Sequence, residues 1–483
     1  MSAALVVLPL LLPLGTGLLA GVLPRRFAPA VSLAGAFALL AAALVLLARV
    51  MAEGPLGMAF GDWALPFAIV FVADPLGAAM VAVSALMGAA CLSYQWAGVD
   101  AAEETDTLHP LLHLLLAGVC GAFLTGDLFN LYVWFEVMLV AAVGLFIHQR
   151  GAAAQEAAFK YFLLNAFGTL LFLAAIAWLY ARTGHLNFAA LQPALAALPA
   201  NERLALGLAL ALGFLLKAGA FPLFGWLPAS YHVLPTPVLA LFAGLLTKVG
   251  VYALLRVWGE VIPDLPAIAF EGLGLVAMAT MLVGVLGAAF HWDIRRILTF
   301  HIISQIGYML LAIALDSREG KAATTFYIVH HIIVKANLFL IAALMFRLTG
   351  SFDLRQSGGL WKTHPWLGLL FLVPALSLVG IPPLSGFWAK FMVVRESFAS
   401  AHYLWGAMAL VVGFLTLYSM MKVWMEGFWK PAPEGRAVAT APLPRTAVAV
   451  VAVLAGLTLL IGFAPDGLNA IAQAAAAAME ERP

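Results

Sequence analysis

The sequence predicts an all-α polytopic membrane protein with about 14 transmembrane helices, including two inverted five-helix repeats that each contain a proline-broken helix. Three observations predict this class. The chain is 64% hydrophobic and 10% charged, with a mean hydropathy of +1.02, whereas soluble domains carry about 25% charged residues. Apolar runs of about 20 residues, long enough to cross about 30 Å of hydrocarbon, recur along the chain. Two sequence patterns also occur twice. An outer-membrane barrel would instead show shorter, alternating segments.

The composition argues against several other classes of protein. A formal net charge of +1 leaves no electrostatic footprint for nucleic acid. Cys91 and Cys120 lie in apolar helices without a CxxC or Cys/His cluster, so we expect no metal, iron–sulfur centre or other cofactor. The first apolar run lacks a basic lead-in and a cleavage site, so we expect a retained helix rather than a signal peptide.

Apolar windows predict the membrane spans in order along the chain. They lie at residues 4–23, 29–50, 74–96, 108–125, 127–147, 157–181, 203–227, 234–258, 267–290, 296–315, 322–348, 365–398, 402–427 and 446–464. The stretch Gly54–Val72 is interrupted by Gly and Pro, and we expect a short hairpin there. No segment is predicted to form a soluble domain.

The chain repeats part of its own pattern. "FKYFLLNAFGTLLFLAAI" (Phe159–Ile176) resembles "FYIVHHIIVKANLFLIAA" (Phe326–Ala343), and "FPLFGW" (Phe221–Trp226) resembles "PPLSGFW" (Pro382–Trp388). The offsets, 167 and 161 residues, correspond to five helices. An odd number of spans between two copies inverts their topology, as in many transporters. The predicted parts are an N-terminal three-helix segment (1–107), a first inverted repeat (108–258), a second (267–427), and a C-terminal helix with its tail (428–483).

Lys and Arg placement predicts the orientation in the membrane, because cytoplasmic loops collect positive charge. Of the 25 Lys and Arg residues, 12 follow odd-numbered spans and 8 lie on the other side. This bias places both termini on the outer side of the cell's inner (plasma) membrane.

Five charged residues lie well inside predicted spans: Glu136, Lys217, Lys248, Lys335 and Lys390. Each such charge costs about 2.5–3.5 kcal/mol on insertion scales, so each needs a physical reason. Snorkelling to the interface suits a lysine near a helix end, such as Lys160. A buried structural ion pair, for example between Glu136 and Lys217, explains one lysine but not four.

A relay of titratable groups explains the whole set. Burial disfavours the charged form of an ionisable group and an opposite charge favours it, so a lysine that gains and loses a carboxylate partner can take up and release a proton. Histidines can connect such sites. His331 shares a helix face with Lys335, four residues away. His330 and His301 are possible auxiliary members, although a membrane histidine is as often a hydrogen-bonded packing residue.

Prolines predict where the helices break. Pro222, Pro382 and Pro383 each remove a backbone hydrogen bond inside an apolar run. Backbone groups freed at membrane depth need protein or water as partners, so we expect hydrated pockets beside Lys217 and Lys390. Lys217 precedes its break and Lys390 follows its own, so the two predicted half-channels are related without being identical.

Four stretches carry a family resemblance: "GDLFNLYVWFEVML" (Gly126–Leu139), "LLKAGAFPLFGWLPASYHVLPTPVLALFAGLLTKVGVYALLR" (Leu215–Arg256), "HHIIVKANLFL" (His330–Leu340) and "GIPPLSGFWAKF" (Gly380–Phe391). They resemble the proton-translocating antiporter-like subunits shared by respiratory complex I, membrane-bound hydrogenases and Mrp-type Na+/H+ antiporters. The resemblance covers nearly the whole chain, in order. Within this superfamily, "DLFNLYVWFEVML" and "LLTKVGVYALLR" look most like the D subunits of Mrp antiporters.

The resemblance implies roles for individual positions. Glu136 matches the family glutamate that tunes a lysine partner, and Lys217 matches the lysine of the first broken helix. Lys248 matches the connecting lysine, and Lys390 the terminal site of the second broken helix. His331 and Lys335 match the titratable stretch of the eleventh helix. The tenth helix lacks an acid where the repeat would place a counterpart of Glu136.

The resemblance therefore implies a proton-translocating subunit of a multi-subunit monovalent cation (Na+)/H+ antiporter, a transporter component rather than an enzyme. Its expected partners are other membrane subunits, the lipid bilayer, protons and Na+. The alternative is a proton-pumping subunit of an NADH–quinone oxidoreductase or a membrane-bound hydrogenase. A self-sufficient transporter of another solute and a scaffolding subunit with purely structural charges also stay open.

Overall fold

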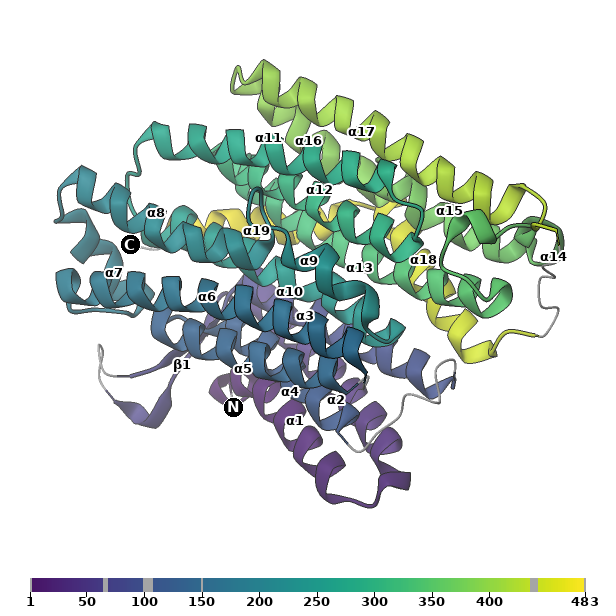
Figure 1. The fold of residues 1–483 in the computed structure, drawn as a ribbon. Helices are drawn as coiled ribbons and strands as arrows, with labels where there is room; N and C mark the ends of the chain where they lie inside the picture. Colours follow the sequence, from purple (N-terminus) through teal and green to yellow (C-terminus); the bar gives the residue numbers. More distant parts are fainter. Residues whose placement is uncertain (1, 64–67, 99–106, 149–150, 435–441, 482–483) are drawn as a thin grey trace.

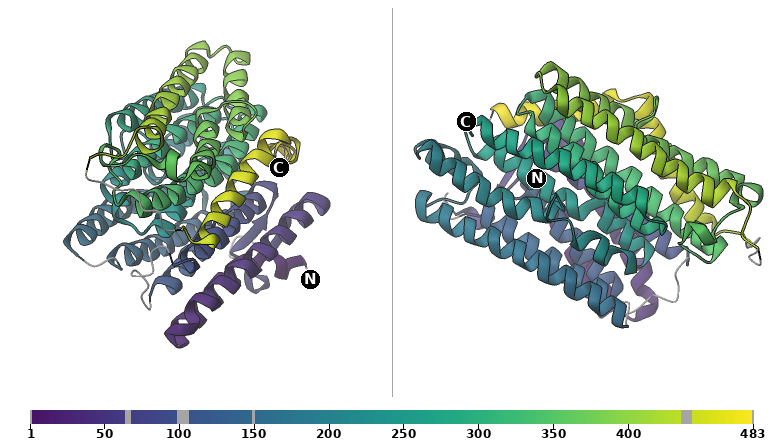
Figure 2. Two further views of the ribbon diagram at one scale, coloured as in Figure 1. Left: turned by 90° about the vertical axis from the view of Figure 1, so that its right-hand side faces the viewer. Right: turned by 45° about the horizontal axis from the view of Figure 1, so that its top comes forward.

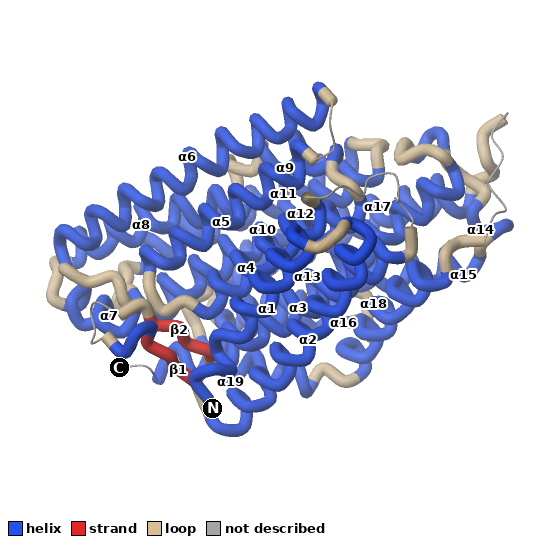
Figure 3. Tube along the Cα trace, turned by 90° about the horizontal axis from the view of Figure 1, so that it is seen from below, coloured by secondary structure: helices blue, strands red, loops and turns tan. Residues whose placement is uncertain are grey.

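A computed structural model describes residues 2–63, 68–98, 107–148, 151–434 and 442–481. Figure 1 shows a bundle of long helices, and Figure 3 shows a two-stranded sheet at one end of it. An apolar chain in lipid has no water to satisfy its N–H and C=O groups, so its backbone forms helices, whose hydrogen bonds are internal. The predicted class, an all-α multi-pass membrane protein, is confirmed.

Within the described residues, eleven helical segments are long and apolar enough to cross a membrane. Their helices are α1 (Ser2–Val22), α2 (Ala28–Glu53), α3 (Pro75–Trp96), α5 (Leu128–Ile147), α6 (Ala152–Thr183), α10 (Thr236–Arg256), α11 (Ala267–Phe290), α12 (Ile294–Ala314), α13 (Arg318–Thr349), α17 (Tyr403–Trp424) and α18 (Arg445–Phe463). The remaining predicted spans contain α4 (Leu108–Leu124), α8 (Ala200–Ala218), and the pair α15 (Pro365–Val379) and α16 (Ser385–Ala399). Every predicted span therefore contains a helix.

Shorter elements complete the described fold. They are α7 (Phe188–Ala196), α9 (Trp226–Ser230), α14 (Leu360–Thr363), α19 (Asp466–Glu481), the single turns η1 (Arg25–Phe27), η2 (Phe60–Asp62), η4 (Tyr231–Val233) and η6 (Leu354–Gln356), and the π-helical turns η5 (Val257–Val261) and η7 (Met425–Trp429). The expected hairpin is confirmed as β1 (Leu56–Ala59) paired antiparallel with β2 (Val70–Ala73), although residues 64–67 lie outside the described part. Helices α7 and α19 were not predicted.

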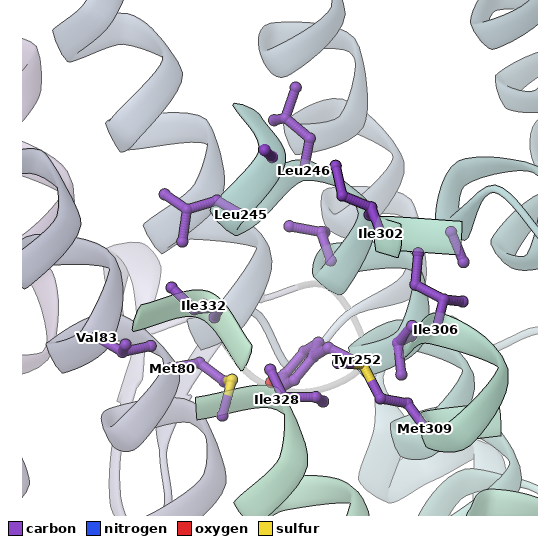
Figure 4. Close-up of a cluster of buried hydrophobic side chains, with 14 of the residues drawn as sticks. Met80, Val83, Leu245, Leu246, Tyr252, Ile302, Ile306, Met309, Ile328 and Ile332 are labelled. Atoms are coloured by element: carbon purple, nitrogen blue, oxygen red, sulfur yellow. The ribbon is translucent and has the colours of Figure 1, made fainter. Parts of the chain in front are cut away.

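The centre of the bundle is made by α10 and α13, which are buried along their membrane windows, together with α12 and α3. Figure 2 shows the N-terminal helices and the α16–α17 pair at opposite edges of the bundle. Figure 4 shows part of the centre, where Met80 and Val83 of α3 lie near Leu245 of α10 and Ile328 and Ile332 of α13. Membrane helices associate by close packing of this kind, because lipid supplies no hydrophobic force between them.

Local geometry recurs at a constant offset of 166 residues. Asp127 forms a bridge with Asn187, and Asp293 forms one with Asp353. Asp127 and Asp293 also cap the N-termini of α5 and α12 with their side chains. Both α6 and α13 have 32 residues and end at a left-handed glycine. These pairs support the division into two repeats, whose inverted relation and boundaries stay predictions.

Candidate functional site

The first break lies between α8 and α9. α8 ends at Ala218, and Gly219 follows it in a left-handed conformation with φ 75°. The Gly219 N–H donates to the Leu216 carbonyl over 3.1 Å, and the Ala220 N–H donates to the Leu215 carbonyl over 3.0 Å, which is a Schellman cap. α8 ends before Gly219 and α9 begins at Trp226, so the helix is interrupted in the stretch that contains Pro222. The residue that ends α8 is Gly219, three positions before the proline, and the role of Pro222 in the break stays a prediction. Two of the carbonyls at the end of α8, those of Leu215 and Leu216, are thereby satisfied.

Lys217 lies in the last turn of α8, next to this cap. Its side chain is buried at 2% exposure, and its Nζ lies 5.4 Å from the centre of the Phe135 ring on α5. The Nζ has no hydrogen-bond partner within the described protein. The face of the Phe135 ring and the negative C-terminal end of the α8 dipole both stabilise a positive charge on this nitrogen.

Glu136, the predicted partner of Lys217, follows Phe135 on α5 and is partly exposed. Glu136 acts electrostatically on Lys217, yet these two described side chains form no direct ion pair within 4.0 Å. The structure therefore brings Glu136 and Lys217 to the same place with a gap between them.

The second break lies between α15 and α16 and resembles the first, except that its lysine belongs to the helix after the break. α15 ends at Val379, and Gly380 follows with φ 97° and the same capping pattern, so Pro382 and Pro383 again lie beyond the helix end. Lys390 projects back from α16, and its Nζ donates to the Val379 carbonyl over 2.9 Å. Lys217 and Lys390 therefore both place their ammonium group at the C-terminal end of a helix that precedes a break. Lys217 belongs to that helix, α8, whereas Lys390 reaches the end of α15 from α16.

Lys390 also lies against an aromatic ring and a cavity. Its Nζ is 4.6 Å from the centre of the Tyr308 ring on α12, the helix that lacks an acid. A cavity of about 250 Å³ opens beside it between α15, α16 and α17, and Lys390 is the only charged residue of its described lining. A pocket was expected here, but most of its lining is apolar.

Lys248, Lys335 and His331 meet in the middle of the bundle, on α10 and α13, and all three are fully buried. The Lys248 Nζ donates to the Ala243 carbonyl of its own helix over 2.6 Å. The Lys335 Nζ and both ring nitrogens of His331 have no hydrogen-bond partner within the described protein. Lys248 acts electrostatically on both groups, so the three lie within reach of one another's charge.

The two auxiliary histidines are hydrogen-bonded. The Nδ1 of His330 lies 2.8 Å from the Ser385 hydroxyl, at the first residue of α16. The Nε2 of His301 lies 3.0 Å from the Ser419 hydroxyl on α17. Both contacts suit a packing role as well as a place beside the relay, and His301 lies within electrostatic range of Lys335 and Lys390.

One charged cluster was missed by the sequence reasoning. Arg256, near the end of the predicted span 234–258, is buried at the end of α10 and forms ion pairs with Asp74 and Glu260. The available signal was the four-residue spacing from Arg256 to Glu260 and the position of Asp74 before a proline, which is typical of a helix N-cap. Among the described residues, no group of three His, Cys, Asp or Glu side chains is placed to hold a metal ion.

Comparison with known proteins gives a consistent result. A family model described as NADH:quinone oxidoreductase/Mrp antiporter, transmembrane, matches residues 125–419. The chain is 39% identical over 465 residues to the Na(+)/H(+) antiporter D subunit of Alkalihalophilus pseudofirmus, covering 96% of this chain and 94% of the relative. A chain in the structure of the Mrp complex from Dietzia sp. DQ12-45-1b superposes with a TM-score of 0.91 at 30% identity, covering 99% of this chain and 98% of that chain. A chain of respiratory complex I from Thermus thermophilus with bound NADH gives 0.83 at 26% identity, covering 98% and 99%. The chain therefore belongs to the NADH:quinone oxidoreductase/Mrp antiporter transmembrane family, together with the Na+/H+ antiporter D subunits.

Proposed function

We propose that this chain is the proton-translocating subunit of a multi-subunit monovalent cation (Na+)/H+ antiporter in the plasma membrane. One observation carries the proposal. Lys217, Lys248, Lys335 and Lys390 are buried in the membrane bundle, and none of them forms an ion pair with a carboxylate within the described residues. A permanently charged, unpaired ammonium at this depth is costly, so these groups gain and lose protons.

The order of the groups suggests how a proton would move. Glu136 and Lys217 would form one end of the relay, Lys248 with His331 and Lys335 its centre, and Lys390 its other end. The gap between Glu136 and Lys217 and the absence of direct bonds between successive groups require water between them. A proton on one group repels the next through the low-dielectric interior, so occupancy of one site would promote release from its neighbour.

The relatives indicate which cation exchange the relay would drive. D subunits of Na(+)/H(+) antiporters match this chain over nearly its whole length. We therefore expect proton flow to be coupled to Na+ exchange within an assembly of other membrane subunits. A proton-pumping subunit of an NADH–quinone oxidoreductase is the second candidate, favoured by the similarity to the complex I chain at 26% identity. The 39% identity to the antiporter subunit favours the first.

The orientation proposed from the positive-inside bias puts both termini on the outer side. The N-terminus, the hairpin, α7 and the C-terminus gather at the same end of the bundle (Figure 3). This arrangement supports placing both termini on one side of the membrane, and the charge bias selects the outer one.

The experiment that tests the proposed function uses the complete complex in sealed vesicles. Na+ addition to vesicles with an acidic interior should release the trapped protons, which a pH-sensitive dye reports. Glu136→Ala and Lys217→Ala should each reduce this release at least tenfold while the purified complex keeps all its subunits. Lys160→Ala is the matched control, because Lys160 is an exposed membrane-helix lysine paired with Glu156.

Two results would contradict the proposal. Normal antiport by both assembled mutants would exclude the relay through these residues. Antiport by the purified chain alone would instead favour a self-sufficient transporter over a subunit of a complex.

A further inference from the structure

The buried cluster at the end of α10 has a geometry that links it to the relay. Arg256 donates two hydrogen bonds to Asp74, the residue that caps α3, and one of 2.7 Å to Glu260 in η5. The Arg256 side chain is 4% exposed, that of Asp74 0% and that of Glu260 5%. Within these three groups, two carboxylates share one guanidinium.

Tyr252 connects this cluster to the interior of the bundle. Its hydroxyl accepts a hydrogen bond from the Arg256 Nε over 3.0 Å and donates one to the Phe123 carbonyl over 2.7 Å. One face of α10 and its π-helical turn carries four polar residues at intervals of four: Lys248, Tyr252, Arg256 and Glu260. Figure 4 shows the Tyr252 ring near Met80, Met309 and Ile328, an apolar surrounding in which charges are weakly screened.

The second repeat offers a contrast. The π-helical turn η7 follows α17 as η5 follows α10, and it also carries an ion pair between residues four apart, Glu426 and Lys430. There the Lys430 side chain is 54% exposed and that of Glu426 is 19% exposed. Of these two pairs, the pair between Arg256 and Glu260 is buried and has Asp74 as a third partner.

We propose that Asp74, Arg256 and Glu260 are positioning residues that set the charge state of Lys248 from the end of its own helix. This inference rests on the proposed function, in which Lys248 carries protons. At a rise of about 1.5 Å per residue, Arg256 lies about 12 Å along α10 from Lys248. Glu260 lies beyond Arg256, in the π-helical turn η5. The two carboxylates favour the ammonium form of Lys248, and the guanidinium opposes it.

Other titratable groups also lie on the elements packed against α10. They include Lys335, His331, His330, Tyr327 and Lys321 on α13, Lys217 on α8, His301 and Tyr308 on α12, His109, His113 and Cys120 on α4, and Cys91 and Tyr94 on α3. Among the side chains described on the elements packed against η5, α7 contributes no titratable group and α19 contributes Asp466 and Glu480. None of these residues is substituted in the variants below.

The test is the pH dependence of Na+-driven proton release by the complete complex in vesicles. Removing a negative charge with Glu260→Gln or Asp74→Asn should move the pH of half-maximal transport down by about half a unit to one unit, for an effective dielectric of about 20. Removing the positive charge with Arg256→Gln should move it up by a similar amount. Arg256→Lys keeps the charge and should leave the midpoint in place.

Control variants distinguish an electrostatic effect on Lys248 from a failure of the complex to fold or assemble. Glu426→Gln removes an equivalent acid from η7 and should cause no shift. Arg256→Gln leaves the buried Asp74 carboxylate without the guanidinium charge beside it, and such a variant can fail to assemble. The double variant Asp74→Asn with Arg256→Gln removes both charges together and should keep the midpoint of the wild type, whereas Glu260→Gln retains a hydrogen-bond acceptor and assembles.

Different results would refute the proposed function and the inference about the Asp74, Arg256 and Glu260 cluster. A wild-type complex without Na+-coupled proton release would refute the proposed function. An active wild type in which Glu260→Gln and Asp74→Asn keep the wild-type midpoint, or lose rate with no shift, would overturn this inference alone and leave the cluster a structural clamp. Shifts of the same sign for Arg256→Gln and Glu260→Gln would also overturn it.

Discussion

Two glycines determine where the end lysines lie. Gly219 and Gly380 adopt a left-handed conformation that side-chain-bearing residues rarely adopt, and each ends a helix at membrane depth. At Gly380 the lack of a side chain has a second use, because a Cβ there would lie 2.8 Å from the Cδ of Lys390. The glycine thus lets the lysine stem pass and reach the Val379 carbonyl.

This close approach predicts that Gly380→Ala displaces Lys390 as well as straining the backbone. We expect the variant to lose about 1 kcal/mol or more of stability and at least tenfold in transport rate, measured by thermal unfolding of the complex and proton release from vesicles. Gly350→Ala is the control, because Gly350 has φ 71° but open space where its Cβ would lie. Equal transport by the two variants would show that the Lys390 contact is unimportant.

At the scale of elements, side-chain caps stabilise the N-termini of two helices at equivalent positions of the repeats, α5 and α12. Asp127 accepts a hydrogen bond from the Asn130 N–H over 2.8 Å at the start of α5, the helix that carries Glu136. Asp293 accepts one from the Arg295 N–H over 2.8 Å at the start of α12. The first N–H groups of a helix lack internal partners, so these carboxylates satisfy donors that would otherwise be left without one.

We therefore expect Asp127→Ala to destabilise the protein by about 1 kcal/mol, while Asp127→Asn, which keeps a capping oxygen, costs a few tenths. Thermal unfolding of the purified complex at constant detergent measures both. Equal melting temperatures for the Ala and Asn variants would show that the cap contributes little here.

For the whole molecule, one end of the bundle is distinctive. It carries both termini, the hairpin, α7 and α19, and α19 packs its buried face of Ala472, Ala475, Ala476 and Met479 into the protein (Figure 3). In the orientation proposed above, this end faces the outside of the cell.

Cysteine labelling in intact cells tests that orientation. A single cysteine at Glu53, next to the hairpin, should react with a membrane-impermeant maleimide added outside, because Glu53 is exposed. A single cysteine at Arg355, exposed near the opposite end of α13, should react only after the cells are opened. Cys91 and Cys120 are buried and are replaced by serine in both variants. The reverse pattern would invert the proposed topology.

The sequence by itself determined the class of the protein, the positions of the spans and the identity of the buried lysines. These follow from local rules, since apolar length and internal backbone hydrogen bonding require helices, and a charge inside an apolar run is visible without a fold. The tertiary structure decided what surrounds each charge: the gap between Glu136 and Lys217, the return of Lys390 to the end of α15, and the burial of Arg256. Those features depend on side chains brought together from helices distant in the chain, and sequence spacing does not encode such contacts.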